Sequence, residues 1–164
     1  MLGKNGASSN YLSEYAMPQI SQTLPAHHKH CDDLFSVAEE AAQRGQWQAC
    51  NDAYGSFAAA LLAHFDAEET LLFPAFEKAT GMTSGPTQMM RMEHGQMREL
   101  LSQLEAAMLA KDADTFSGVA ETLLILTQQH NMKEENILYP MCDQALGSEV
   151  EQLTVQLTKR LAGS

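Results

Sequence analysis

Two segments of the chain repeat one pattern of residues that can bind metal ions. Residues 64–74 and residues 130–140 both read H-x3-E-E-x-[LI]-L-[FY]-P. Each segment therefore pairs a histidine with a glutamate four positions later: His64 with Glu68, and His130 with Glu134. Positions four apart lie on one face of a helix, so both members of a pair point the same way. Imidazole and carboxylate together suit iron, manganese or zinc.

The spacing of apolar residues directs these pairs into a protein core. Leucines and isoleucines share or border the same helix faces, and a buried carboxylate is very unfavourable unless a cation or a shared proton accompanies it. A heptad seam in the following segment also contains a histidine: Met90, His94, Met97, Leu101, Leu104 and Met108. A single histidine–glutamate pair is typical of a protein surface, but two matching copies and a core histidine predict two metal ions bridged by the glutamates.

A further histidine is expected from the first helix, where three candidates lie close together. His28 precedes Cys31, Phe35 and Ala38 at steps of three, four and three, and this spacing favours it. His27 and His30 have related spacings to Leu34, so both stay open as alternatives. In the last repeat, Glu135 is an alternative to Glu134 as the bridging carboxylate.

Four long helices are expected to position these side chains. Gly45, the stretch 81–86 and the turn near Lys111 separate helical patterns, and Gly147 ends the last of them. The expected helices cover residues 17 or 26 to 44, 46–79, 86–110 and 114–146, followed by a short C-terminal helix at 149–161. Short loops favour an all-α, up-down-up-down antiparallel four-helix bundle. We expect residues 17–164 to form this single domain and residues 1–16 to form a loose polar arm.

The predicted bundle carries one internal difficulty. The break at residues 81–85 lies closer in sequence to His94 than to His64, so the two would not lie level if the second helix ran its full length. We therefore expect the second helix to end soon after Pro74 or Phe76, with the following loop running back along the bundle. Pro74 and Pro140 are interpreted as bends that follow the curvature of the bundle.

Composition limits the classes of partner. The 164 residues carry a formal net charge of −11, which opposes binding to nucleic acids and to anionic membranes. The sequence contains no apolar run long enough for a membrane span and no signal-peptide pattern. Three cysteines without metal-binding spacing fit a reducing, cytoplasmic location.

The chain resembles the hemerythrin-like HHE cation-binding family, and is most similar to its bacterial di-iron branch that includes repair-of-iron-centres proteins. The resemblance is carried by residues 85–94 and by residues 130–140. It implies that His64, Glu68, His94, His130 and Glu134 bind two iron ions, with both glutamates bridging, together with one first-helix histidine and a bridging oxo or hydroxo group. Oxygen-carrying hemerythrins have a second histidine one turn after His94, where this sequence has Arg98.

These observations support three hypotheses about function. The first is a non-haem di-iron protein that interacts with dioxygen, nitric oxide or peroxide in sensing, redox chemistry or stress protection. The second is an iron-handling or iron-centre repair protein, although the first 26 residues lack the cysteine of the full repair proteins. The third is a metal-free acidic helical interaction module, which would leave His94, Glu68 and Glu134 unexplained. Whether the protein is an enzyme stays open.

Overall fold

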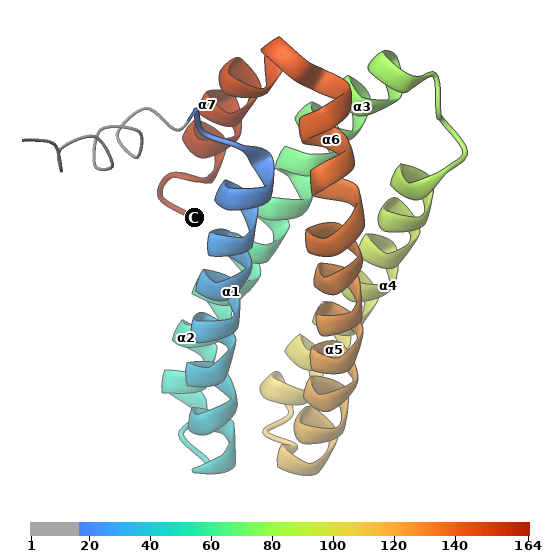
Figure 1. The fold of residues 1–164 in the computed structure, drawn as a ribbon. Helices are drawn as coiled ribbons and strands as arrows, with labels where there is room; N and C mark the ends of the chain where they lie inside the picture. Colours follow the sequence, from blue (N-terminus) through green and yellow to red (C-terminus); the bar gives the residue numbers. More distant parts are fainter. Residues whose placement is uncertain (1–16) are drawn as a thin grey trace, which may run out of the picture.

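The computed structural model describes residues 17–164, and this part of the chain is helical without strands. The expected arm of residues 1–16 lies outside the described residues. The predicted all-α bundle is confirmed, with four long helical segments and a short helix at the C-terminal end (Figure 1). None of the described helices combines the length and the apolar character that a membrane crossing requires.

Two antiparallel hairpins form the long body of the bundle. The first joins α1 (Ile20–Gln43) to α2 (Trp47–Ala67), and the second joins α4 (Pro86–Leu109) to α5 (Ala113–Lys133). The tip of the first hairpin contains Gly45 in the left-handed conformation, with φ of +68°, which glycine adopts without a steric penalty. These tight tips place each pair of helices side by side along the bundle (Figure 1).

Each repeated segment contains one π-helical turn. The turns cover Glu68–Leu72 and Glu134–Leu138, and α3 (Phe73–Thr80) and α6 (Tyr139–Leu146) continue directly from them. The amide of the residue after each turn donates to the carbonyl five positions earlier, that of Glu68 or Glu134. The prolines that follow lack an amide hydrogen for the regular ladder. The expected smooth bends are therefore π turns, a feature that is frequent at functional sites.

The expectation that the second helix ends soon after Pro74 or Phe76 is wrong. The helix continues through α3 to Thr80 and ends at Gly81, whose φ of +73° suits glycine. The following loop descends beside the bundle before α4 begins (Figure 1). The loop, and not an early end of the helix, therefore compensates for the unequal distances in sequence from the break to His64 and to His94.

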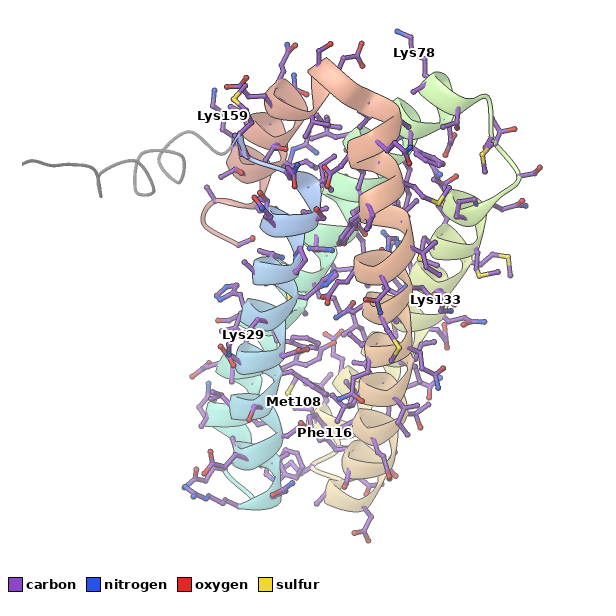
Figure 2. The ribbon with its side chains drawn as sticks, in the orientation of Figure 1. Lys29, Lys78, Met108, Phe116, Lys133 and Lys159 are labelled. Carbon is purple, nitrogen blue, oxygen red and sulfur yellow. The ribbon has the colours of Figure 1, made fainter. Side chains whose placement is uncertain are left out.

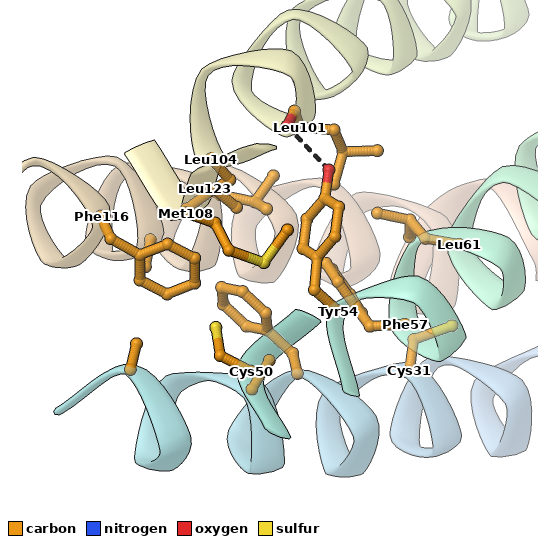
Figure 3. Packing of buried hydrophobic residues seen from close by; sticks show 14 of the residues in the cluster. Cys31, Cys50, Tyr54, Phe57, Leu61, Leu101, Leu104, Met108, Phe116 and Leu123 are labelled. Carbon is orange, nitrogen blue, oxygen red and sulfur yellow. Dashed lines mark hydrogen bonds between the residues drawn. The ribbon is translucent and has the colours of Figure 1, made fainter. Parts of the chain in front are cut away.

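Two apolar clusters fill the bundle. One lies toward the hairpin tips and contains Tyr54, whose hydroxyl donates to the Leu101 carbonyl at 2.7 Å (Figure 3). Met108 and Phe116 also point inward there, whereas Lys29 and Lys133 lie at the outside (Figure 2). The other cluster gathers under α7 (Val150–Leu161), α3, α6 and the start of α1. Between the two clusters lies a layer of buried polar side chains.

Candidate metal centre

The buried polar layer contains all six side chains that the sequence predicts as metal ligands. They are His28, His64, Glu68, His94, His130 and Glu134, and each is at most 5% exposed. The histidines come from α1, α2, α4 and α5, and each glutamate is the first residue of a π turn. Four helical segments therefore contribute to one buried cluster.

The six side chains form two overlapping groups of four that share both glutamates. We call His28 and His64 with the two glutamates the first half-site, and His94 and His130 with the same glutamates the second half-site. Within each half-site, one ligand atom from every residue lies within 4.8 Å of the others. Such a group has the composition and size to hold one metal ion.

Each glutamate divides its two oxygens between the half-sites. Oε1 of Glu68 lies 3.4 Å from Nε2 of His64, and its Oε2 lies 3.2 Å from Nε2 of His94. Oε2 of Glu134 lies 3.1 Å from Nε2 of His28, and its Oε1 lies 2.9 Å from Nε2 of His130. A carboxylate placed in this way can bridge two metal ions.

Two carboxylate oxygens on the side of the second half-site support this interpretation. Oε2 of Glu68 and Oε1 of Glu134 are buried and form no hydrogen bond of regular geometry among the described residues, although Nε2 of His94 and of His130 face them. An unsatisfied buried acceptor is destabilising, and more so when it belongs to a charged group. A bound cation would satisfy both atoms, so the site fits a metal.

Outer carboxylates orient three of the four histidines. Nδ1 of His28 lies 2.7 Å from Oε1 of Glu135. Nδ1 of His94 lies 2.7 Å from Oε1 of Glu69, and Nδ1 of His130 lies 2.8 Å from Oε2 of Glu93. A carboxylate that accepts the Nδ1 hydrogen fixes the tautomer and points Nε2 at the metal position. The structure thus places Glu134 inside the cluster and Glu135 in the layer around it.

The three histidines of α1 occupy different layers. His28 enters the first half-site, and its Nε2 lies 3.0 Å from Nε2 of His64. His27 lies behind His64, with 3.0 Å between their Nδ1 atoms. His30 is exposed and contacts the carbonyl of Ser164 at 3.1 Å. Of the three candidates, the structure therefore brings His28 to the other predicted ligands.

Tyr139 also lies in the site, although the sequence alone did not place it there. Its hydroxyl donates to the carboxylates of Glu68 and Glu134, at 2.6 Å and 2.8 Å, and lies 3.1 Å from Nε2 of His28. Tyr139 follows the second π turn directly, as Phe73 follows the first. The signal was the aromatic position shared by both repeats just before the prolines.

Opposite charges hold the metal-free cluster together. Burial alone would lower the pKa of His130, but the carboxylates of Glu134 and Glu68 outweigh it and raise the pKa to about 9. Burial acts against ionisation of Glu68, yet the neighbouring imidazoles of His64 and His94 bring its pKa well below the usual range. Burial and the same carboxylates raise the pKa of Tyr139. A bound cation would take over the role of these protons.

Comparison with known proteins agrees with this geometry. The family model of the hemerythrin HHE cation-binding domain matches residues 19–142. A DNA nickase from Nostoc sp. (strain PCC 7120 / SAG 25.82 / UTEX 2576) is 26% identical over 147 residues. The match covers 90% of this chain and 40% of the nickase, so the chain spans less than half of that relative's length. No solved structure matches the chain. Because the family model covers most of the chain and all six side chains of the cluster, this protein belongs to the hemerythrin HHE cation-binding family.

Proposed function

We propose that the protein holds two iron ions and interacts through them with dioxygen, nitric oxide or peroxide. The observation that carries the proposal is the division of each buried glutamate between the two histidine pairs. Two carboxylates and four imidazoles form a donor set that suits iron. Iron in such a set supplies redox chemistry and a binding position for a small ligand.

The protein's own residues contribute orientation and exclusion of water. The outer carboxylates hold the imidazoles in place, and such hydrogen-bond partners maintain metal affinity. Phe65 stacks on His94, with ring centroids 4.0 Å apart, and Phe73 lies on the same ring at 5.8 Å. Together with the burial of Phe65 and Phe73, this aromatic cover shields His94 from water.

The first test is the metal content of the full chain, purified without chelators and analysed by elemental analysis. We expect two irons per chain, and the reduced protein should change its optical spectrum with nitric oxide or dioxygen. A stable spectrum would indicate binding, and a spectrum that decays with return of the oxidised form would indicate turnover. A chain that binds no iron under reducing conditions would contradict the proposal.

A matched pair of variants tests the ligand set. His28→Ala removes an imidazole that points into the first half-site, so we expect it to lose bound iron. His30→Ala changes the same residue type on the same helix, but His30 is exposed and lies outside the cluster, so iron content should be unchanged. If both variants keep two irons, His28 is not a ligand.

DNA cleavage is not part of the proposed function. The named activity of the Nostoc relative belongs to a protein of which this chain covers 40%. The net charge of −11 opposes approach to a phosphate backbone. A gel assay with supercoiled plasmid would test this, and metal-dependent nicking by the isolated chain would overturn it.

A further inference from the structure

The hydroxyl oxygen of Tyr139 is close to a ligand atom of every residue in the first half-site. The distances are 2.6 Å to Glu68 Oε1, 2.8 Å to Glu134 Oε2, 3.1 Å to His28 Nε2 and 3.4 Å to His64 Nε2. Protein nitrogen and oxygen atoms bind metal ions at about 2.1 Å, so neighbouring ligands at right angles lie about 3.0 Å apart. The tyrosine oxygen is therefore spaced from the four atoms as a ligand of the same ion would be.

The four other atoms are also spaced as neighbours around one ion. Nε2 of His28 lies 3.0 Å from Nε2 of His64 and 3.1 Å from Oε2 of Glu134, and Nε2 of His64 lies 3.4 Å from Oε1 of Glu68. Each of these three distances is close to the separation expected between two ligands of one ion. The Tyr139 oxygen lies close to all four of these atoms, so it can share an ion with them.

We propose that Tyr139 is the fifth protein ligand of the metal ion at the first half-site. The inference rests on the proposed function, because it requires that the cluster binds metal. Tyrosine oxygen is an established iron ligand in proteins. Coordination forms an oxygen–metal bond and releases the hydroxyl proton to solvent, with no change in the oxidation state of the ion.

The second half-site offers a comparison within the same molecule. Phe73 occupies the position that corresponds to Tyr139, and its ring lies 5.8 Å from His94 at 20°. The ring of Tyr139 lies 5.8 Å from His28 at 25°. The two rings are thus placed alike, and the phenylalanine lacks only the oxygen atom.

The consequence of this difference is an unequal pair of metal positions. Oε2 of Glu68 and Oε1 of Glu134 both face the second half-site, where Phe73 has no hydroxyl to offer. With five protein ligands at the first half-site and four at the second, an added small ligand binds at the second. Tyr139 thereby decides which ion reacts.

Visible absorption and resonance Raman spectra of the full chain test the proposal. The chain is loaded anaerobically with iron(II) and then oxidised to iron(III). We expect a tyrosinate-to-iron(III) charge-transfer band, and tyrosinate ring vibrations when the laser is tuned to that band. Tyr139→Phe should lose both signals, and iron content measured on the same samples separates loss of the tyrosinate from loss of the ion. Tyr54→Phe is the matched control, because the Tyr54 hydroxyl is buried and bonded to the distant Leu101 carbonyl; this variant should keep both signals.

The outcomes separate the inference from the proposed function. Wild-type protein with two irons and no tyrosinate signal would show that Tyr139 only donates a hydrogen bond to the glutamates, and the inference would be wrong while the proposed function stands. A chain without iron would overturn both. The double variant Tyr139→Phe with Phe73→Tyr should regain the tyrosinate signal, which would exclude general damage to the fold as the cause of its loss.

Discussion

The two half-sites are related by position in the sequence but are surrounded by different side chains. His28 and His94 are 66 positions apart, and so are His64 and His130. The ligands are therefore equivalent pairs. The neighbours are not: Tyr139 stands where the other half-site has Phe73, and His27 stands where it has Glu93.

The difference extends to the charges behind the ligands. At the second half-site, Arg98 donates to both oxygens of Glu69 at 2.9 Å and 3.1 Å, and Lys133 pairs with Glu93. At the first half-site, Glu135 is 39% exposed and contacts no lysine or arginine within residues 17–164. The position that corresponds to Arg98 is Asp32.

This comparison indicates how one repeated motif can give two kinds of metal position. The second half-site keeps both imidazoles fixed by carboxylates that are themselves held by cations, which preserves its geometry when a small ligand enters or leaves. At the first half-site we propose that the hydroxyl of Tyr139 is an additional oxygen donor. The six ligands make metal binding possible at both half-sites, and the residues around them make the two half-sites different.

The largest expected effect is the loss of both half-sites together. Glu68→Ala removes one oxygen from each, so we expect almost complete loss of bound iron, measured by elemental analysis. Unfolding should become easier by about 2.7 kcal/mol for each ion that is held at a free concentration of about 100 times its Kd. Glu121→Ala, an exposed glutamate of α5, is the control and should change neither quantity. Retention of one iron by Glu68→Ala would show that the carboxylate does not bridge.

The sequence was sufficient to predict the helical bundle and most of its inward polar side chains. Helix breaks are encoded by glycine and proline, and the histidine–glutamate pairs fall on the face that the apolar residues define. The same rule favoured His28 but left His27 and His30 open, and the contacts between helices distinguish the three. These features depend on local periodicity, which a single sequence records.

The sequence did not reveal the π turns or the place of Tyr139. On a regular helix of 3.6 residues per turn, five residues rotate by about 140° beyond a full turn, so Tyr139 would point away from Glu134. The π turn returns Tyr139 to the same face, as the bond from its amide to the Glu134 carbonyl shows. Outer partners such as Glu93 also depend on contacts between helices, which periodicity does not contain.

Acidity should weaken metal binding, and by different amounts at the two half-sites. The pKa of His130, about 9 in the metal-free chain, means that an ion must displace a proton from it below that pH. Affinity at the second half-site should therefore rise about tenfold per pH unit and level off near pH 9. The same proton stabilises the metal-free fold below pH 6.5, and this stabilisation is lost as pH rises to about 9.

At the first half-site, burial is outweighed by the carboxylate of Glu134, which raises the pKa of His28. Coordination by Tyr139, as proposed above, would release its hydroxyl proton in addition. The affinity of the first half-site for metal should therefore rise more steeply with pH than the affinity of the second half-site. Calorimetry with cobalt(II) between pH 6 and pH 9 would resolve the two binding events. Equal slopes would remove this part of the comparison.

A smaller effect is expected from the orienting residues. Glu93→Gln keeps the size of the side chain but removes the charge that holds His130, and changes of this kind typically weaken metal binding 10–100-fold. His27→Ala is the corresponding change at the first half-site, where His27 lies behind His64. Burial and the adjacent histidines lower the pKa of His27 to about 4, so it is a neutral partner, and we expect less than about a tenfold loss. Calorimetry would measure both, and a larger loss in His27→Ala would reverse the comparison.

The smallest effect should come from Arg98→Lys, because a lysine keeps the charge but cannot donate to both oxygens of Glu69 at once. Arg98 is 40% exposed, so solvent screens the pair and the free energy of unfolding should fall by about 1 kcal/mol or less. The result that distinguishes Arg98→Lys from the other variants is which half-site loses affinity for metal. Glu69 orients His94 alone, so cobalt(II) binding should weaken at the second half-site and stay constant at the first. If binding weakened equally at both, the salt bridge would support the bundle as a whole, and the two half-sites would not have separate supporting residues.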